Sequence, residues 1–452
     1  MAIQQFLISK ILQPLQQRIT AGWSEKTKDR VFILCGLALF FHTFLDGMGV
    51  IPYRYLIFFA INCLLLGGMV LCTLNKDMKP VRFRLFPTVC WFCIGFLMLL
   101  AGVLVTDNRL PEAMLFLVVY PAIYLVWNNI DRQKIFALLS RVCILSFVPY
   151  TLINILLYPM GVKQYGGLMC NVNGASFYLL LVFACLLVEI LDARKFDRKL
   201  ILHIIAFGLC VAQIYYTSSR TGYLAGILVA VSTLIMYVIL HRKEKLWLLT
   251  LGKLLACALS AVVLVNSAFY LFQASKLYPE FLASLNLPTE DAVSGDLVLN
   301  LDAVSDLNDN KFAILDKSLD RISTGRISIW KAFGAELNLL GHPDGDSYYI
   351  SILGREIFTT HNTILQFGYE SGIPAGVLYL LFNLFTGVAS IAHARRYRKE
   401  RFSMLPFAVT LTFGFMSLLS SLGVSFYYMI TLYYYLVQFP LMVKQEDANK
   451  AA

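Results

Sequence analysis

Charged residues are scarce in this sequence of 452 residues, at 15%, whereas hydrophobic residues make up 58%. A chain with so little charge does not form a soluble globular domain. Apolar stretches of about 18 or more residues recur along it, each long enough to cross a hydrocarbon core of about 30 Å as a helix. No alternating barrel pattern is present, so helices must satisfy the backbone within lipid. We therefore predict an all-α polytopic membrane protein.

The apolar stretches predict about twelve spans, and the basic residues are spread unequally between the two sides. We place the spans near residues 31–50, 55–74, 85–105, 112–127, 135–157, 175–191, 200–216, 222–240, 246–270, 374–392, 403–421 and 426–443. The termini and alternate connections then hold 25 of the 38 Lys and Arg, and the short loops of the other side hold four: Arg54, Arg109, Lys163 and Arg220. By the positive-inside rule both termini are cytoplasmic. The net charge of +10 therefore reflects the orientation of the chain in the membrane and does not indicate a nucleic-acid partner.

This topology divides the chain into five parts. They are a cytoplasmic interfacial segment at 1–30, spans one to nine at 31–271, an extracytoplasmic loop at 272–373, spans ten to twelve at 374–443, and a cytoplasmic tail at 444–452. The first segment has apolar residues at helical spacing, which is typical of a helix lying on a membrane surface. The loop, of about 100 residues, is expected to be mainly helical.

Within the loop the predicted elements are an irregular part at 286–310 and three helices. The helices run over 311–322, from Arg326 to Leu340 with Gly341 as its stop signal, and from an N-cap at Thr360 to Gly372. Pro374 then opens span ten.

The loop has no cysteine, although the chain has ten, which excludes a disulfide-stapled outer domain. It also lacks a His, Glu and Cys set with metal-ligand spacing. Asp344-Gly345-Asp346 resembles the metal-binding pair of nucleotide-sugar transferases. Activated nucleotide sugars are cytoplasmic, however, so a turn is the better interpretation. We predict no obligatory metal and no cofactor.

Two arginines on the poorly basic outer side are candidate anion ligands. Arg220 lies in a short loop with Ser218, Ser219 and Thr221, whose hydroxyls are further donors. The alternative for Arg220 is an anchor that reaches lipid headgroups. Arg326 opens a predicted helix, where the helix dipole disfavours a cation. A helix end and a guanidinium together suit an anion, and the alternative is a salt bridge to a nearby carboxylate.

His361 is the candidate general base. It stands at the start of the last helix of the loop, immediately before Asn362. A helix N-terminus and nearby arginines favour the neutral imidazole that a base needs. The alternative is a purely structural histidine. His342, between Gly341 and Pro343, is interpreted as a turn residue.

The ordered set of these motifs resembles the O-antigen ligase and O-antigen polymerase superfamily of bacterial envelope proteins, over roughly the second half of the chain. The matching segments are Asn171-Val172-Asn173-Gly174, Ser219-Arg220-Thr221-Gly222, Arg326-Ile327-Ser328-Ile329-Trp330 with Leu340-Gly341, and His361-Asn362-Thr363-Ile364-Leu365 with Glu370-Ser371-Gly372-Ile373. His342-Pro343-Asp344 departs from the family, which often has a glycine-richer turn there.

The resemblance implies a metal-independent, inverting membrane glycosyltransferase. Such an enzyme transfers a glycan from an undecaprenyl diphosphate carrier to a hydroxyl acceptor on the outer face of the cytoplasmic (inner) membrane. His361 would then be the base, and Arg220 and Arg326 would bind the diphosphate. The further substrate contacts implied are Ser219, Asn173, Asn362 and Trp330.

Three functions compete at this point. The first is a polymerase of O-antigen or capsular polysaccharide, and the second is a ligase that passes the glycan to lipid A-core of lipopolysaccharide or to another acceptor. The third is a flippase or permease for lipid-linked glycans, which would place ionisable residues at mid-membrane depth. The predicted spans hold few such residues, so an enzyme is favoured, with polysaccharide-assembly proteins as potential partners.

Overall fold

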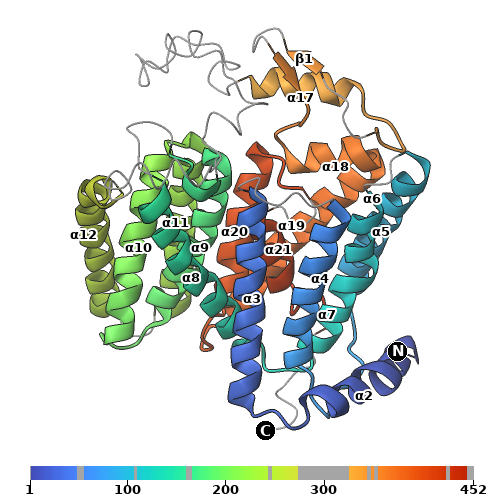
Figure 1. Ribbon diagram of the computed structural model, residues 1–452, viewed down its shortest axis with the longest axis horizontal. Helices are drawn as coiled ribbons and strands as arrows, with labels where there is room; N and C mark the ends of the chain where they lie inside the picture. The colour runs from blue at the N-terminus through green and yellow to red at the C-terminus, as the bar shows by residue number, and fades with distance from the viewer. Residues whose placement is uncertain are drawn as a thin grey trace.

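The computed structural model describes residues 2–47, 55–105, 109–158, 165–169, 171–242, 247–272, 325–343, 348–350, 355–423 and 428–444. The predicted elements at 286–310 and 311–322, and the Asp344-Gly345-Asp346 turn, lie outside these residues. The described part is a bundle of helices with one small hairpin, which confirms the all-α class (Figure 1). Eight of its helical segments are long and apolar enough to cross a membrane, so the chain is a polytopic membrane protein.

The eight segments account for most of the bundle. They are α5 (Leu85–Leu104), the run Arg109–Trp127 made of α6 (Arg109–Met114), η3 (Leu115–Val119) and α7 (Tyr120–Trp127), then α8 (Arg132–Leu157), α9 (Val172–Asp192), α10 (Arg198–Thr217), α11 (Arg220–His241), α12 (Trp247–Leu271) and α19 (Ile373–Arg396). Two shorter apolar helices, α4 (Tyr55–Cys72) and α20 (Leu405–Leu419), pack among them, and α3 (Glu25–Gly47) packs against α4 and α8.

The final expected span, at 426–443, coincides with α21 (Met429–Val437), which has only nine helical residues. At 1.5 Å per residue, nine residues rise about 14 Å, roughly half of a hydrocarbon core. All nine are buried. This helix therefore packs inside the bundle and does not offer a face to lipid.

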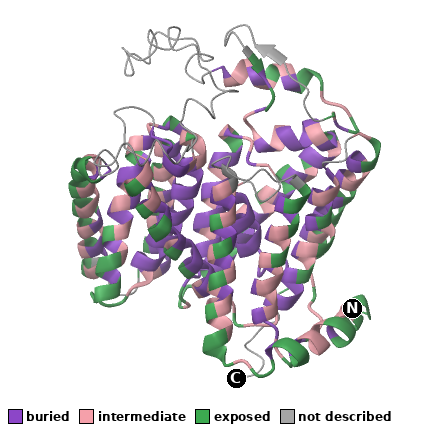
Figure 2. Cartoon of the chain, in the orientation of Figure 1, coloured by how far each residue is buried: buried purple, intermediate pink, exposed green. Residues whose placement is uncertain are grey.

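Helix α9 forms the centre of the bundle. In the most apolar 18 residues of α9, 94% are buried, compared with 17% in α12 at the edge of the bundle. Figure 2 shows buried residues in the middle and exposed ones at the outer helices. A helix that is apolar on all sides belongs in a core. Helices α8, α10, α11 and α20 surround α9.

Polar contacts at one end of the bundle fix α20 against α9. The backbone N–H of Phe402 donates to Asp192 Oδ2 at 2.6 Å, and Arg401 Nη2 donates to Glu189 Oε2 at 3.0 Å. The chain therefore enters α20 where α9 ends. Because the two helices pack against each other, Leu419 at the end of α20 lies toward the second end of the bundle, where α9 starts.

The described part of the long loop lies at that second end. It consists of α17 (Arg326–Ala335), β1 (Tyr348–Ile350), β2 (Arg355–Ile357) and α18 (Thr363–Ser371), and Figure 1 shows α17 and β1 above α18, with α2 at the opposite end of the molecule. Strands β1 and β2 are antiparallel, with Tyr348 opposite Ile357. The sequence predicted no strand here, because three residues are too few to show alternation.

Two predicted helix boundaries in the loop were wrong. Helix α17 ends at Ala335, five residues before Leu340, since the segment after it turns to contact α18. The N-cap of α18 is Asn362 and not Thr360: Asn362 Oδ1 accepts from the N–H of Leu365 at 3.0 Å. Asparagine and threonine both suit this position, so residue type could not decide between them. As predicted, Pro374 lies in the first turn of α19.

The N-terminal segment is helical from Ala2 to Thr20, through α1 (Ala2–Leu7), η1 (Ile8–Leu12), α2 (Gln13–Leu15) and η2 (Gln16–Thr20). Gln4 Oε1 accepts from the N–H of Val81 at 3.0 Å, which fixes this segment to the α4–α5 connection. Ile3 and Phe6 are 77% and 59% exposed. An exposed apolar row on a docked helix agrees with the predicted interfacial segment.

Candidate functional site

Three of the predicted site residues meet where α10 turns into α11. Ser218 adopts a left-handed conformation with φ 53°, and Ser219 then caps α11 by accepting from the N–H of Gly222 at 3.1 Å. The hydroxyl of Ser219 donates to Asn173 Oδ1 of α9 at 3.3 Å. Arg220, the next residue, is exposed. Asn173 and Ser219 are therefore in contact, with Arg220 next in the chain, and their binding of substrate stays a prediction.

Gly222 explains how α11 comes so close to α9. A Cβ at this position would lie 2.9 Å from Ser176 Oγ, which is too short for a non-bonded contact. Ser176 in turn donates to Thr217 Oγ1 at 3.1 Å. The glycine of the Ser219-Arg220-Thr221-Gly222 motif is therefore a packing residue, and it holds Arg220 at the start of α9.

Arg326 lies near Arg220, although the two are 106 positions apart in the sequence. Arg326 is the first residue of α17, after Gly325 with φ 78°. Burial lowers the pKa of the Arg326 guanidinium, and the positive charge of Arg220 lowers it further. Arginine keeps its proton in proteins. The charge of Arg220 therefore makes the charged form of Arg326 less favourable, and an anion bound nearby would offset that effect.

Helix α17 is held in place by packing on α18. Ile329 and Phe333 are buried, and the Phe333 ring meets Tyr369 edge-on with centroids 4.8 Å apart. Trp330, one turn after Arg326, packs at the border of this apolar cluster. Its indole Nε1 is buried and has no hydrogen-bond partner within the described residues. Trp330 is therefore a neighbour of Arg326, while a substrate contact by its ring stays a prediction.

Two glycine turns, one after α17 and one after α18, pack against each other. A Cβ on Gly341 (φ +95°) would lie 2.3 Å from the carbonyl oxygen of Glu370, and a Cβ on Gly372 (φ +89°) would lie 2.1 Å from that of Leu339. The N–H of Ile373 donates across the junction to the carbonyl of Asn338 at 2.8 Å. The two glycine-containing motifs of the sequence are therefore the two halves of one contact.

His342 belongs to the same junction. Its ring stacks on Tyr369 at 4.2 Å, nearly parallel, and its backbone N–H donates to the Tyr369 carbonyl at 2.9 Å. Its Nε2 also lies 2.6 Å from the Glu336 carbonyl. His342 is thus a structural residue of a turn, as the sequence predicted.

His361 has a left-handed backbone, with φ 50°. For a residue other than glycine this conformation costs about 1–3 kcal/mol and must be imposed by its surroundings. Thr360 and Asn362 impose it: the hydroxyl of Thr360 donates to the Asn362 carbonyl at 2.7 Å and accepts from the Asn362 N–H at 3.2 Å. Strain of this kind is typical of functional sites.

Asn362 and Thr363 join this segment to the end of α20. Asn362 Nδ2 donates to the Leu418 carbonyl at 3.2 Å, and Thr363 Oγ1 donates to the Ser420 carbonyl at 2.8 Å. Both ends of the Asn362 amide are therefore used within the protein. A direct contact of Asn362 with substrate stays a prediction, and the structure gives its side chain a role in positioning.

The predicted residues thus gather at one end of the bundle. Asn173, Ser219 and Arg220 lie at the starts of α9 and α11, which pack against α20. His361 and Asn362 lie against the end of α20, and Arg326 and Trp330 lie on α17 above α18. The arrangement can bind an anion between two guanidiniums and place an imidazole at the same end.

Sequence reasoning missed a polar network in this region. Arg109 forms ion pairs with Glu112 at 2.9 Å and with Glu370 at 2.8 Å, and Gln366 Nε2 donates to Glu370 at 2.6 Å. A signal was present: Arg109 is one of four basic residues in short outer loops, and Gln366 and Glu370 are four apart on one predicted helix.

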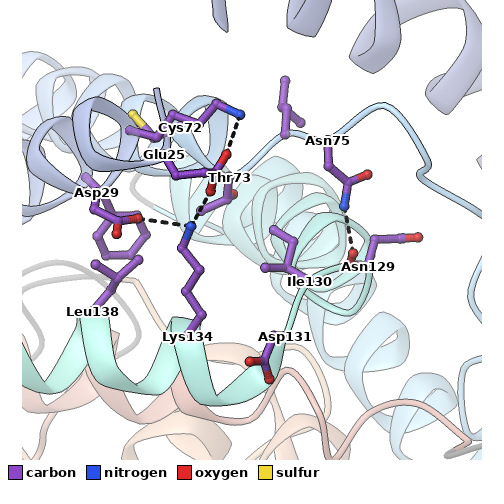
Figure 3. A pocket seen from close by; sticks show the side chains of 13 residues that line it. Glu25, Asp29, Cys72, Thr73, Asn75, Asn129, Ile130, Asp131, Lys134 and Leu138 are labelled. Carbon is purple, nitrogen blue, oxygen red and sulfur yellow. Dashed lines mark hydrogen bonds and ion pairs between the residues drawn. The ribbon is translucent and has the colours of Figure 1, made fainter. Parts of the chain in front are cut away.

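A hollow of about 240 Å³ lies elsewhere, between the start of α3, the end of α4 and the link from α7 to α8 (Figure 3). Lys134 bridges Glu25 at 2.5 Å and Asp29 at 3.1 Å, and Asn75 donates to the Asn129 carbonyl at 2.8 Å. Its polar groups thus satisfy one another. None of the predicted site residues lines it.

No group of His, Cys, Asp and Glu side chains that would hold a metal ion occurs within the described ranges. The fold and the site therefore define a polytopic α-helical membrane protein with an arginine pair at one end of its bundle. No protein-family model and no curated protein sequence matches the chain.

Proposed function

We propose that this protein is a membrane glycosyltransferase that moves a glycan from an undecaprenyl diphosphate donor to a hydroxyl acceptor, most simply as a polymerase of O-antigen or capsular polysaccharide. The observation that carries the proposal is the nearness of Arg220 to Arg326, whose charged form the charge of Arg220 makes less favourable. A diphosphate offers several oxygens and at least two negative charges, so it fits between two guanidiniums that can each bind in a bidentate manner.

The proposed reaction is a displacement at the anomeric carbon of the donor glycan. His361 accepts the proton of the acceptor hydroxyl as its oxygen attacks, and the bond from the anomeric carbon to the diphosphate oxygen breaks. The electron pair leaves with the diphosphate, which Arg220 and Arg326 stabilise. Attack opposite the leaving group inverts the anomeric configuration, and the step requires no metal.

Simple electrostatics gives the scale of this stabilisation. A guanidinium about 4 Å from a phosphate gains about 4 kcal/mol at an effective dielectric of about 20. At about 1.4 kcal/mol per tenfold in rate, two such contacts supply several powers of ten. They accelerate the reaction to the extent that the charge on the leaving oxygen grows in the transition state.

The proposed orientation follows from the basic residues. Twelve membrane crossings with both termini in the cytoplasm put the loop at 272–373 outside, and the positive-inside bias supports that orientation. The loop itself is acidic, with 14 Asp and Glu against 7 Lys and Arg. The protein then resides in a bacterial cytoplasmic membrane with its site on the outer surface, where lipid-linked glycans are used.

The experiment uses purified protein in proteoliposomes with an undecaprenyl diphosphate-linked repeat unit as the only substrate. A ladder of products together with free undecaprenyl diphosphate supports a polymerase. Transfer only after lipid A-core is added supports a ligase, which is the alternative with the same chemistry. Movement of intact lipid-linked glycan across the membrane with no new glycosidic bond would refute the enzyme proposal in favour of a flippase. His361→Ala is expected to abolish transfer.

A further inference from the structure

A continuous chain of polar contacts runs from Arg109 in α6 to the residue before His361. Arg109 Nη2 pairs with Glu370 Oε1 at 2.8 Å, and the same carboxylate oxygen accepts from Gln366 Nε2 at 2.6 Å. Gln366 Oε1 in turn accepts from the backbone N–H of Thr360 at 2.8 Å. The chain therefore couples a helix of the bundle, α6, to the start of α18.

The carboxylate of Glu370 determines how the Gln366 amide is oriented. A carboxylate accepts hydrogen bonds and cannot donate them, so the NH₂ group of Gln366 must face Glu370. Its carbonyl oxygen must then face the N–H of Thr360, and it also accepts from Ser421 Oγ at 3.3 Å. A neutral amide at position 370 removes this constraint, because it can present either an oxygen or an NH₂ group to Gln366.

The ion pair that begins the chain is largely shielded from solvent. The side chains of Arg109 and Glu370 are 9% and 20% exposed. Arg109 is also paired with Glu112 at 2.9 Å, which fixes its guanidinium from a second side. Pairs shielded to this degree constrain geometry much more than exposed surface pairs do.

The end of the chain acts on a strained residue. Thr360 is fully buried, and it controls the backbone on the N-terminal side of His361, whose φ of 50° must be imposed. We propose that Arg109, Glu370 and Gln366 are positioning residues that hold the imidazole of His361 in its reactive direction. This inference rests on the proposed role of His361 as the base, and it adds a remote ion pair as the element that sets the base's geometry.

The test compares two single variants with their combination. Glu370→Gln and Gln366→Glu each break the chain. The first removes the carboxylate that orients the Gln366 amide, and the second sets two carboxylates side by side. The combination Gln366→Glu with Glu370→Gln exchanges the two groups. The carboxylate now at position 366 would accept from the N–H of Thr360 and from the amide now at position 370. The oxygen of that amide would accept from Arg109, so every donor would again meet an acceptor.

We expect each single variant to lower kcat about tenfold or more, within the about hundredfold that a misplacement of about 1 Å costs. KM for the donor should stay near the wild-type value, because the chain does not reach the diphosphate ligands, and the pH at which kcat declines should not move. The exchanged double variant should recover most of kcat. Hydrogen exchange at the Thr360 N–H should be faster in Glu370→Gln and protected again in the double variant.

Glu400→Gln is the matched control. Glu400 also binds an arginine from a distant segment, Arg132 at 2.8 Å, with 26% of its side chain exposed, but it lies at the other end of the bundle. It should change neither kcat nor exchange at Thr360. Unchanged exchange at Thr360 in Glu370→Gln would overturn the inference, as would faster exchange with full kcat. Absence of transfer by the wild-type protein would overturn the proposed function alone, because the exchange measurement does not depend on it.

Discussion

Replacing Gly341 with alanine should open the junction that joins the segment after α17 to the start of α19. At φ +95° an alanine is strained by about 1–2 kcal/mol. Its Cβ would lie 2.3 Å from the Glu370 carbonyl oxygen, and relieving such a contact costs about 1–3 kcal/mol. The two costs together are about 2–5 kcal/mol. Because the neighbour is backbone, no side-chain rotation can relieve the contact.

The assay is hydrogen exchange at the two backbone bonds that cross the junction. His342 N–H donates to the Tyr369 carbonyl and Ile373 N–H to the Asn338 carbonyl. At about 1.4 kcal/mol per tenfold, exchange at both should accelerate at least about tenfold. Transfer activity should fall as well, since α17 carries Arg326.

Gly334→Ala provides the control in the same region. Gly334 lies within α17, and a Cβ there would have no atom within 4 Å. The change should therefore stabilise the helix slightly, by about 0.5–1 kcal/mol, and slow exchange there. Equal exchange rates in the Gly341→Ala and Gly334→Ala variants would refute the interlocked-turn account.

Three further outcomes are expected. Arg220→Lys and Arg326→Lys should each weaken donor binding about tenfold or more despite the retained charge, because lysine cannot bind a phosphate in a bidentate manner; unchanged affinity would contradict a diphosphate clamp. Removing divalent cations with a chelator should leave transfer intact, and a loss that is restored by added metal would overturn the metal-independent mechanism. Lys253→Met should lower the thermal unfolding midpoint, since buried Lys253 donates to the carbonyls of Leu191 (3.0 Å) and Ala193 at the end of α9. Losing those bonds costs about 1–3 kcal/mol. A drop in the unfolding midpoint no larger than that of Lys331→Met, at an exposed position, would contradict a stabilising role for Lys253.

The sequence predicted those features that depend on short stretches of chain. Apolar runs located most of the membrane helices to within a few residues, as in α5, expected at 85–105 and found at Leu85–Leu104. The capping signals were present, but choosing Thr360 over Asn362 was wrong because two good capping residues stood close together. Helix α17 ended early because tertiary contacts of the following turn outweighed its helical pattern.

Features that depend on contacts between distant segments could not be predicted from local sequence patterns. Gly341 and Gly372 were recognised as turn signals, yet their steric contacts with the Glu370 and Leu339 carbonyls appear only in three dimensions. The pairing of Arg109 with Glu370 spans 261 positions, so the scarcity of outer basic residues marks Arg109 but does not identify its partner. The nearness of Arg220 and Arg326 was predicted from a family resemblance, and single-sequence periodicity would not have found it.

The most direct test of the central claim measures the affinity of purified protein for undecaprenyl diphosphate. If Arg220 and Arg326 bind the same diphosphate, Arg220→Ala and Arg326→Ala should each weaken binding about tenfold or more, in line with charged hydrogen bonds of about 1.5–3 kcal/mol. Arg242→Ala, an exposed arginine at the opposite end of α11, should bind as the wild type does. Wild-type affinity in either of the first two variants would contradict the account.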